Sequence, residues 1–350
     1  MREATSAMLL AAPAGSQQHS PQPAFAPVAL RTDDAELAGR VRRLTDLAGV
    51  GLAVVPVGTA MPLAAVLLDE DASGALTVVV DPARADTADA EVPAAVRLPG
   101  EEARLLDVVV TAATPHRART VGVLAAHGGA GASALAAVLA RSCVNAGAAT
   151  ALVDLDPAGG GLDVLLGLEF DPGRRWADVR EERGALVPDR LALALPSWHL
   201  VRVLSGDRRG GADVDDLAVR SAVRALGQGH DVVVLDLPRQ VLAPGAARDV
   251  WLDRCDDVVL LSCGGVRPGA AAMAAAPLAA AGCGVHLVVR APRPDAEEVA
   301  ASAGLPLAAA MRTERKLPSD VDHGLRPGDR RRGPLMTTAR ELVRLLELAP

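Results

Sequence analysis

The sequence predicts an α/β protein built around a mostly parallel sheet with helices on both faces, preceded by a smaller α/β unit. Three observations predict this fold class. From residue 120 onward, continuous apolar runs of strand length alternate with stretches of helical periodicity, the pattern of a parallel sheet buried on both faces. A glycine-rich segment joins the first run to the first helical stretch. The 350 residues, half of them hydrophobic, are enough for two domains of about 150 residues each.

The composition excludes several classes of protein. Two Phe, three Trp and no Tyr leave a core of Ala, Val and Leu and no stacking platform for single-stranded nucleic acid. A net charge of -7 argues against a dedicated nucleic-acid surface. Lys316 is the only lysine, so chemistry that needs a lysine elsewhere is excluded. No apolar run reaches the ~18 residues that span a bilayer, and the four cysteines, which lack metal-site spacing, indicate reduced thiols in a cytoplasmic protein.

The chain divides into three parts. Residues 1–27, rich in Ala, Pro, Gln and Ser, are expected to form a disordered tail. Residues 28–114 are expected to form a small α/β domain, in which a helical segment ending at Gly49 precedes three strand-length apolar runs. Residues 115–350 are expected to form the larger domain. Its predicted strands are 120–126, 150–156, 231–236, 257–262 and 284–289.

Helical periodicity in the larger domain predicts helices over 134–147 and 213–229 and a terminal amphipathic helix over 335–348. The terminal helix is Leu-rich and carries Glu341 and Glu347, which favours packing on the core over insertion into a membrane. The three tryptophans are expected to be buried packing residues.

The segment His127-Gly-Gly-Ala-Gly-Ala-Ser133 lies between a predicted buried strand and a predicted helix. Glycines at such a junction allow backbone N–H groups to face an anion at the helix N-terminus. A Walker A loop also has a lysine before its final Ser or Thr, and that position here is Ala132. Taken alone, the segment also fits a dinucleotide fingerprint with Asp154 as the acidic residue, or a glycine-rich turn without a ligand.

Two further sites favour a P-loop NTPase-like architecture. Asp154 and Asp156 end the second predicted strand, and Asp236 ends another, followed by Leu-Pro-Arg. A carboxylate at the end of a buried strand beside a phosphate loop is what a Mg²⁺ site of this class needs. Read in isolation, Asp236 is equally a cap or turn residue, but the three elements occur in the order that a P-loop protein requires.

The segments HGGAGAS, VDLDPAGGGLDVLLGLE and VVVLDLPR resemble the deviant-Walker MinD/ParA superfamily of P-loop ATPases. Within it, the chain is most similar to the CpaE-like branch, which includes actinobacterial septum site-determining proteins. The resemblance covers about residues 120–350 and is weaker over 29–114, where family members carry a degenerate receiver-like domain. Asp69, Asp71 and Asp81 lie near strand ends there, but a working receiver site also needs a lysine, so no phosphorylatable site is expected.

The resemblance implies ATP and Mg²⁺ as cofactors and a role for each matching residue. Asp154 and Asp156 match the switch I aspartates, of which Asp156 would orient the attacking water. Asp236 matches the Walker B aspartate and, with Ser133, would hold the metal. The phosphate loop corresponds to Gly128, Gly129, Ala130, Gly131, Ala132 and Ser133.

Three departures from the family pattern concern the same site. The signature lysine, which opens the loop and reaches across the ATP-sandwich dimer, is replaced by His127, and the second loop lysine by Ala132. A neutral histidine does not replace a permanently charged lysine. An adenine-contacting asparagine is replaced by Arg290. We therefore expect ATP binding and hydrolysis to be attenuated or lost.

The resemblance implies a spatial regulator of septum placement and cell division, or of pilus or secretion assembly. Such a protein would act in the cytoplasm through protein partners and as a homodimer, without a specific nucleic acid. The Arg330-Arg331-Arg332 run is either a solvated face or a peripheral contact with anionic lipid at the inner face of the membrane. Arg239 is either a solvated loop residue or a charge lent to the site. A nucleotide-free scaffold and a Rossmann-type NAD(P)-binding oxidoreductase are the alternative functions.

Overall fold

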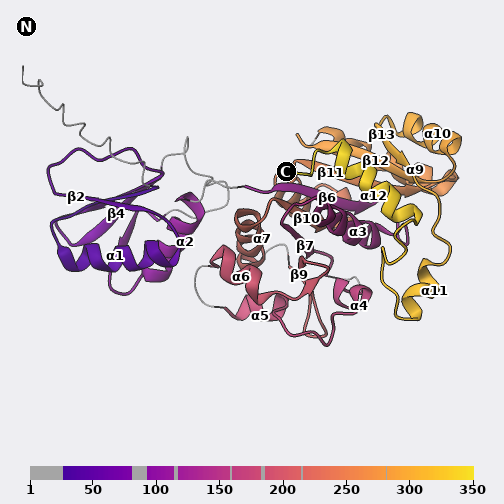
Figure 1. Ribbon diagram of the computed structural model, residues 1–350. Coiled ribbons are helices and arrows are strands. Elements are labelled where there is room, and N and C mark those ends of the chain that lie inside the picture. Colours follow the sequence, from indigo (N-terminus) through magenta and orange to yellow (C-terminus); the bar gives the residue numbers. More distant parts are fainter. Residues whose placement is uncertain are drawn as a thin grey trace, which may run out of the picture.

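The computed structural model describes residues 27–80, 93–113, 117–157, 160–182, 186–213, 216–280 and 282–350. These residues form two sheets, a five-stranded one near the N-terminus and an eight-stranded one in the rest of the chain (Figure 1). The predicted tail lies outside the described residues except for residue 27, as does the predicted boundary at 114.

The smaller sheet has the strand order β2-β1-β3-β4-β5. Helices α1 (Ala35–Leu47) and α2 (Glu102–Ala113) pack against each other beside it. The Asp34 carboxylate caps α1 by accepting hydrogen bonds from the backbone N–H groups of Glu36 and Leu37. The strands are β1 (Val28–Arg31), β2 (Leu52–Val55), β3 (Val66–Glu70), β4 (Ala75–Val80) and β5 (Ala95–Arg97).

The order of this sheet is that of the flavodoxin-like doubly wound fold, but its strand directions differ. β1 is parallel to β2 and β3, whereas β4 is antiparallel to both of its neighbours. Asp69 is bound in an ion pair with Arg31, and the Asp71 carboxylate accepts three hydrogen bonds from Ser73 and Ala75 in a turn. Asp81 lies outside the described residues. The two described carboxylates therefore have structural partners.

The larger sheet has the order β13-β12-β11-β6-β10-β7-β9-β8, and all its pairs are parallel except β8 with β9. The five predicted strands of this domain are confirmed, and three short strands that were not predicted extend its edges. The eight strands are β6 (Arg119–Ala125), β7 (Thr150–Asp154), β8 (Ser197–Trp198), β9 (Val201–Leu204), β10 (Val232–Asp236), β11 (Asp257–Cys263), β12 (Gly284–Arg290) and β13 (Leu307–Ala310).

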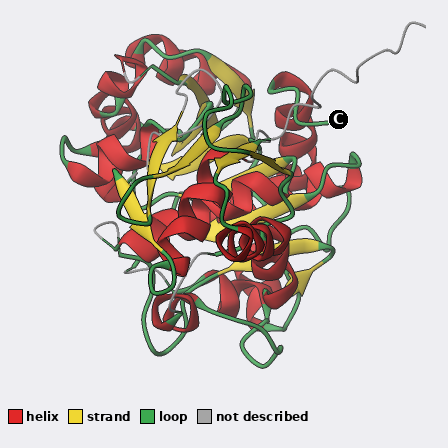
Figure 2. Cartoon of the chain, turned by 90° about the vertical axis from the view of Figure 1, so that its left-hand side faces the viewer, coloured by secondary structure: helices red, strands yellow, loops and turns green. Residues whose placement is uncertain are grey.

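Helices cover both faces of this sheet, as expected for continuous apolar strands (Figure 2). Alternate residues of β10 point into different cores: Val233 and Leu235 into one, Val232 and Val234 into the other. The helices are α3 (Ala132–Asn145), α4 (Leu162–Leu166), α5 (Trp176–Glu181), α6 (Pro188–Ala194), α7 (Leu217–Gly229), α8 (Ala246–Leu252), α9 (Val266–Ala274), α10 (Arg293–Ala303), α11 (Leu317–Asp322), α12 (Pro334–Leu345) and the 3₁₀ turns η1 (Arg239–Leu242) and η2 (Ala276–Ala280).

The terminal helix α12 packs along α3 (Figure 1). Its apolar face, including Leu335, Ala339 and Leu342, is buried in the core that α3 shares with the sheet. The prediction of a core-packing helix is therefore confirmed. All three tryptophans are buried as predicted, with at most 4% of each exposed. Within the described part of the chain, no helix is long and apolar enough to cross a bilayer.

Candidate functional site

The glycine-rich loop connects β6 to α3 at the carboxyl edge of the larger sheet. Gly129 and Gly131 have φ angles of 74° and 98°, a left-handed conformation that favours glycine. Gly131 is the N-cap of α3 and, among the described residues, no side chain caps the helix there. Since the first turn of a helix leaves its N–H groups without intrahelical acceptors, these groups are left for an anion in front of the loop.

Ser133 and Asp236 meet directly beneath this loop. Asp236 is the last residue of β10, which lies between β6 and β7, and the Ser133 side chain lies close to its carboxylate. Only 5% of Asp236 is exposed. Burial raises the pKa of this carboxyl to about 7; the Ser133 side chain lowers it, and the charges of Asp154 and Asp156 raise it. The predicted phosphate-loop and strand-end residues therefore converge at one edge of the sheet.

Asp154 lies opposite Asp236 in the β7–β10 register. Its carboxylate accepts hydrogen bonds from the N–H groups of Asp156 (3.1 Å) and Leu162 (3.0 Å) and from the Ser205 hydroxyl (2.8 Å). Burial raises the pKa of Asp154, while these three donors lower it. Asp154 thus ties the end of β7 to the start of α4 and shapes the segment that carries Asp156.

Asp156 is half-buried and follows the end of β7. With Asp154 it lines an open cavity of about 900 Å³, which continues toward Asp207 and the almost fully exposed side chain of Phe170. Among the described residues, no group of three or more His, Cys, Asp and Glu side chains is placed to hold a metal ion.

A buried ion pair fixes the segment after Asp156. The Arg175 guanidinium binds the Asp163 carboxylate through Nε at 2.8 Å and donates to the carbonyl oxygens of Gly173 and Leu168. Burial raises the pKa of Asp163, and the bond from Arg175 lowers it. These contacts tie the start of α5 to α4 and to the segment that connects the two helices.

The two positions where a loop lysine was expected are occupied differently. Ala132 is 8% exposed in the first turn of α3 and brings no charge. The Nε2 of His127 accepts a hydrogen bond from the Cys263 N–H (3.2 Å), and its Nδ1 lies 3.0 Å from the Gly128 carbonyl oxygen. An amide N–H can bond only to an unprotonated ring nitrogen, so Nε2 is the acceptor in this arrangement and Nδ1 can donate to the Gly128 carbonyl oxygen.

Two arginines reach the loop from elsewhere in the fold, Arg290 from the end of β12 and Arg239 from the start of η1. The sequence offered Arg239 as a charge lent to the site in one of two interpretations, and placed Arg290 at the site only as the replacement of an adenine-contacting asparagine. The Nη2 of Arg290 lies 3.4 Å from the Gly129 carbonyl oxygen and 3.0 Å from the Cys263 Sγ. A Cβ atom built on Gly131 would lie 3.8 Å from the Nη1 of Arg290, and one built on Gly128 would lie 4.0 Å from the Nη1 of Arg239. Arg290 is the last residue of β12, and Arg239 follows the end of β10 by three residues.

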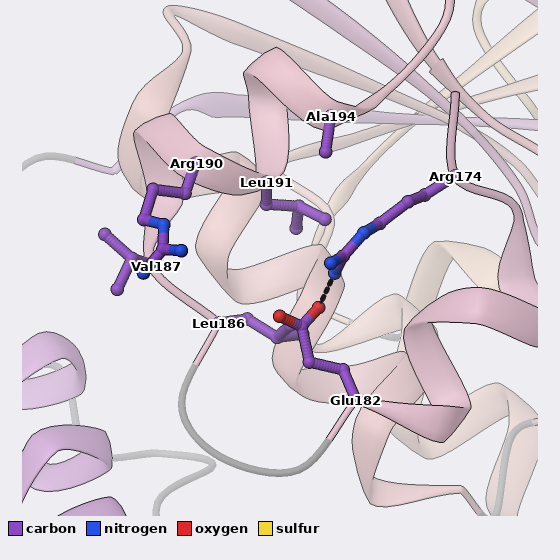
Figure 3. Close-up of a pocket in the computed structure, with 7 residues that line it drawn as sticks. All are labelled: Arg174, Glu182, Leu186, Val187, Arg190, Leu191 and Ala194. Atoms are coloured by element: carbon purple, nitrogen blue, oxygen red, sulfur yellow. Dashed lines mark hydrogen bonds and ion pairs between the residues drawn. The ribbon is translucent and has the colours of Figure 1, made fainter. Parts of the chain in front are cut away.

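A second cavity, of about 200 Å³, lies away from these residues, between the end of α5 and α6 (Figure 3). Arg174 and Glu182 form an ion pair across it, and Leu186 and Leu191 form part of its wall. None of the predicted site residues lines this cavity, which separates it from the phosphate loop.

The larger domain has the fold of the MinD and ParA ATPases. The chain superposes on the ParA family ATPase of Chlorobium tepidum TLS with a TM-score of 0.53 and 15% identity, covering 66% of this chain and 99% of that one. It superposes on the MinC:MinD cell division protein complex of Aquifex aeolicus with a TM-score of 0.54 and 17% identity (66% and 96% covered). A plasmid partition protein of Borrelia burgdorferi B31, bound to AMPPNP, gives 0.51 and 9% (66% and 99%).

Two sequence relatives come from Mycobacterium tuberculosis: uncharacterized protein MT3760 of strain CDC 1551 / Oshkosh and uncharacterized protein Rv3660c of strain ATCC 25618 / H37Rv. Each is 40% identical to this chain over 263 residues, which cover 72% of the chain and 72% of the relative. The chain belongs to the family of these two proteins. No protein-family model matches the chain.

Proposed function

We propose that this chain is a nucleotide-binding protein of MinD/ParA type, of the CpaE-like branch, in which ATP hydrolysis is attenuated or lost. The observation that carries the proposal is the placement of Ser133 close to the Asp236 carboxylate at an uncapped, glycine-rich helix N-terminus. A hydroxyl in the first helical turn near a strand-end carboxylate supplies two hard oxygen ligands beside a row of N–H donors, an arrangement suited to Mg²⁺ and phosphate.

Each residue of the site has a distinct task in this proposal. The N–H groups of the loop from Gly128 to Ser133 would bind phosphate oxygens, and Ser133 with Asp236 would hold Mg²⁺. The metal supplies charge neutralisation on the phosphates when bound. Asp154 keeps the switch I segment in place through its three hydrogen bonds, and Asp156 would orient water.

Attenuated hydrolysis follows from the charges that the loop lacks. A lysine that reaches the β- and γ-phosphates stabilises charge that develops in the transition state. Ala132 is uncharged, and both ring nitrogens of His127 are engaged by backbone groups. The affinity for ATP in the ground state is expected to fall less than the rate of hydrolysis, because the N–H groups of the loop and the proposed metal ligands are retained.

We propose that the protein acts as a spatial regulator of septum placement and cell division or of pilus or secretion assembly. In this role it would bind protein partners from the cytoplasm, form a homodimer and use no specific nucleic acid. The MinC:MinD complex of Aquifex aeolicus supports protein partnership as a property of the fold. Arg330 is paired with Asp320. A peripheral contact with anionic lipid would therefore be made by Arg331 and Arg332, which are both exposed.

The two alternative functions, an NAD(P)-dependent oxidoreductase and a nucleotide-free scaffold, differ from the proposal in the nucleotide that they would bind. A Rossmann fold places the strand after the glycine-rich loop and helix directly beside the first strand, whereas here β10 lies between β6 and β7. That order disfavours an NAD(P)-dependent oxidoreductase. The scaffold alternative shares the fold and differs only in leaving the loop without a nucleotide.

The deciding experiment is isothermal titration of the full chain with ATP, ADP and NAD, with and without Mg²⁺. We expect ATP and ADP to bind more tightly with Mg²⁺ than without it, and Ser133→Ala to remove that difference. Ser221→Ala, a change of the same kind in α7, is the control. If no nucleotide binds, the chain is a scaffold; if NAD alone binds, the proposal is wrong.

A further inference from the structure

We propose that Arg290 and Arg239 bind the phosphates of a nucleoside di- or triphosphate from the two sides of the glycine-rich loop. The inference rests on the proposed function and names the residues that recognise its ligand. Both guanidinium groups lie against loop residues whose own side chains bring no cation.

Arg290 is held in place by its surroundings. It ends β12 directly opposite Cys263 in the register of β11 and β12. Its Nη2 donates to the Cys263 Sγ at 3.0 Å and lies 3.4 Å from the Gly129 carbonyl oxygen, while its Nη1 lies beside Gly131. The side chain therefore extends across the end of β11 toward the loop, and its Nη1 lies next to the N-terminus of α3.

Arg239 approaches from the other side. It follows Asp236-Leu-Pro at the start of η1, it is exposed, and its Nη1 lies beside Gly128. The loop follows β6, which lies between β11 and β10. Arg239, shortly after the end of β10, and Arg290, at the end of β12, therefore lie on opposite sides of the loop. Both cations come from the same subunit, so the charge on the site does not depend on a second copy of the chain.

The charge of these two groups is not neutralised by an ion pair. Among the described residues, Arg239 has neither a hydrogen-bond nor an ion-pair partner, and the partners of Arg290 are a thiol and a carbonyl. Other arginines of this acidic chain do pair with carboxylates, as Arg175 does with Asp163. A guanidinium without an acidic partner presents a planar set of donors that matches two phosphate oxygens.

The test is isothermal titration of the full-length wild type and of Arg290→Gln and Arg239→Gln with ATP, inorganic pyrophosphate and adenosine in Mg²⁺. Each substitution should weaken ATP and pyrophosphate roughly 10- to 100-fold, the usual range for a hydrogen bond to a charged group, and leave adenosine unchanged. Arg290→Lys should recover part of the loss because it restores the charge. Arg293→Gln and Arg248→Gln are the controls: Arg293 is exposed and paired with Glu297, and Arg248 is half-buried and bonded to the Pro277 carbonyl oxygen.

The outcomes separate the two proposals. If the wild type binds ATP and both glutamine variants bind pyrophosphate as the wild type does, the inference is wrong and the proposed function stands. If Arg290→Gln weakens adenosine but not pyrophosphate, Arg290 contacts the base and the inference is again wrong. If the wild type binds neither ATP nor pyrophosphate, the proposed function fails and the inference fails with it. Thermal melting of each variant establishes that it is folded.

Discussion

The Asp236 carboxylate at the end of a central strand lies close to the Ser133 side chain in the first turn of the helix after the glycine-rich loop. The carboxylate is almost completely buried, and two further aspartates raise its pKa. An ionised group in this place is costly unless a cation or a donor balances it. The same contact therefore controls both the stability of the unliganded protein and its capacity to take up a metal.

The stability of the unliganded protein should fall as pH rises from about 4 to about 7. Asp236 has a folded-state pKa of about 7, above its ordinary value of 3.8, so the folded state retains a proton that the unfolded state has lost. The contribution is complete below the unfolded pKa and disappears as pH passes the folded one. Asp236→Asn carries no titrating group and should be more stable than the wild type at pH 8 by about 2–4 kcal/mol.

Denaturant unfolding in EDTA at pH 5 to 8 measures this difference. Asp189→Asn, which removes a charge from an exposed position, is the control and should follow the wild type. Parallel pH profiles for the wild type and Asp236→Asn would show that Asp236 does not retain its proton.

Turnover of ATP by the purified chain should be close to background. Without the loop lysines that stabilise the charge of the transition state, we expect the rate to be roughly 10²- to 10⁴-fold lower than in P-loop ATPases that have them. Phosphate release at saturating ATP and Mg²⁺ measures it, with Asp156→Ala as the reference for zero enzymatic turnover. Rapid wild-type turnover that Asp156→Ala abolishes would mean that another residue stabilises the transition state.

Ala132→Lys should tighten ATP binding about 10-fold or more, since a charged hydrogen bond to phosphate is added where the loop has none. Ala132→Gln is the matched control because it adds length without charge. Titration calorimetry distinguishes the two variants. Equal affinities of the lysine and glutamine variants would show that the first turn of α3 does not direct this side chain toward the phosphates.

Arg175→Met should destabilise the protein by about 3–5 kcal/mol, the usual cost of leaving a buried carboxylate unpaired. The neighbouring Arg174→Met breaks the more exposed ion pair with Glu182 seen in Figure 3 and should cost only about 0–1 kcal/mol. Unfolding free energies of the two variants give the comparison. Similar values would mean that the Arg175–Asp163 pair is not the main support of this segment.

Much of the larger domain could be predicted because its central strands are continuous apolar runs that end in aspartate or turn residues. β9 and β13 were missed, since four residues at the edge of a sheet carry little periodicity. The contact of Arg290 with the glycine-rich loop could not be predicted for a different reason. It depends on which strands lie next to each other, and strand order is a property of the assembled sheet. The hydrogen bond from Ser205 to Asp154 could not be predicted for the same reason, since it depends on β9 lying next to β7.

The position of β6 in the sheet also constrains how the chain is made. Both of its neighbours, β10 and β11, are synthesised long after it, and the second is complete only at Cys263. At ordinary ribosomal rates this leaves the apolar strand without its partners for about ten seconds. Nascent chains that stop before Cys263 therefore expose the centre of the sheet, and the protein should depend on chaperones during synthesis more than a protein with local strand pairing does.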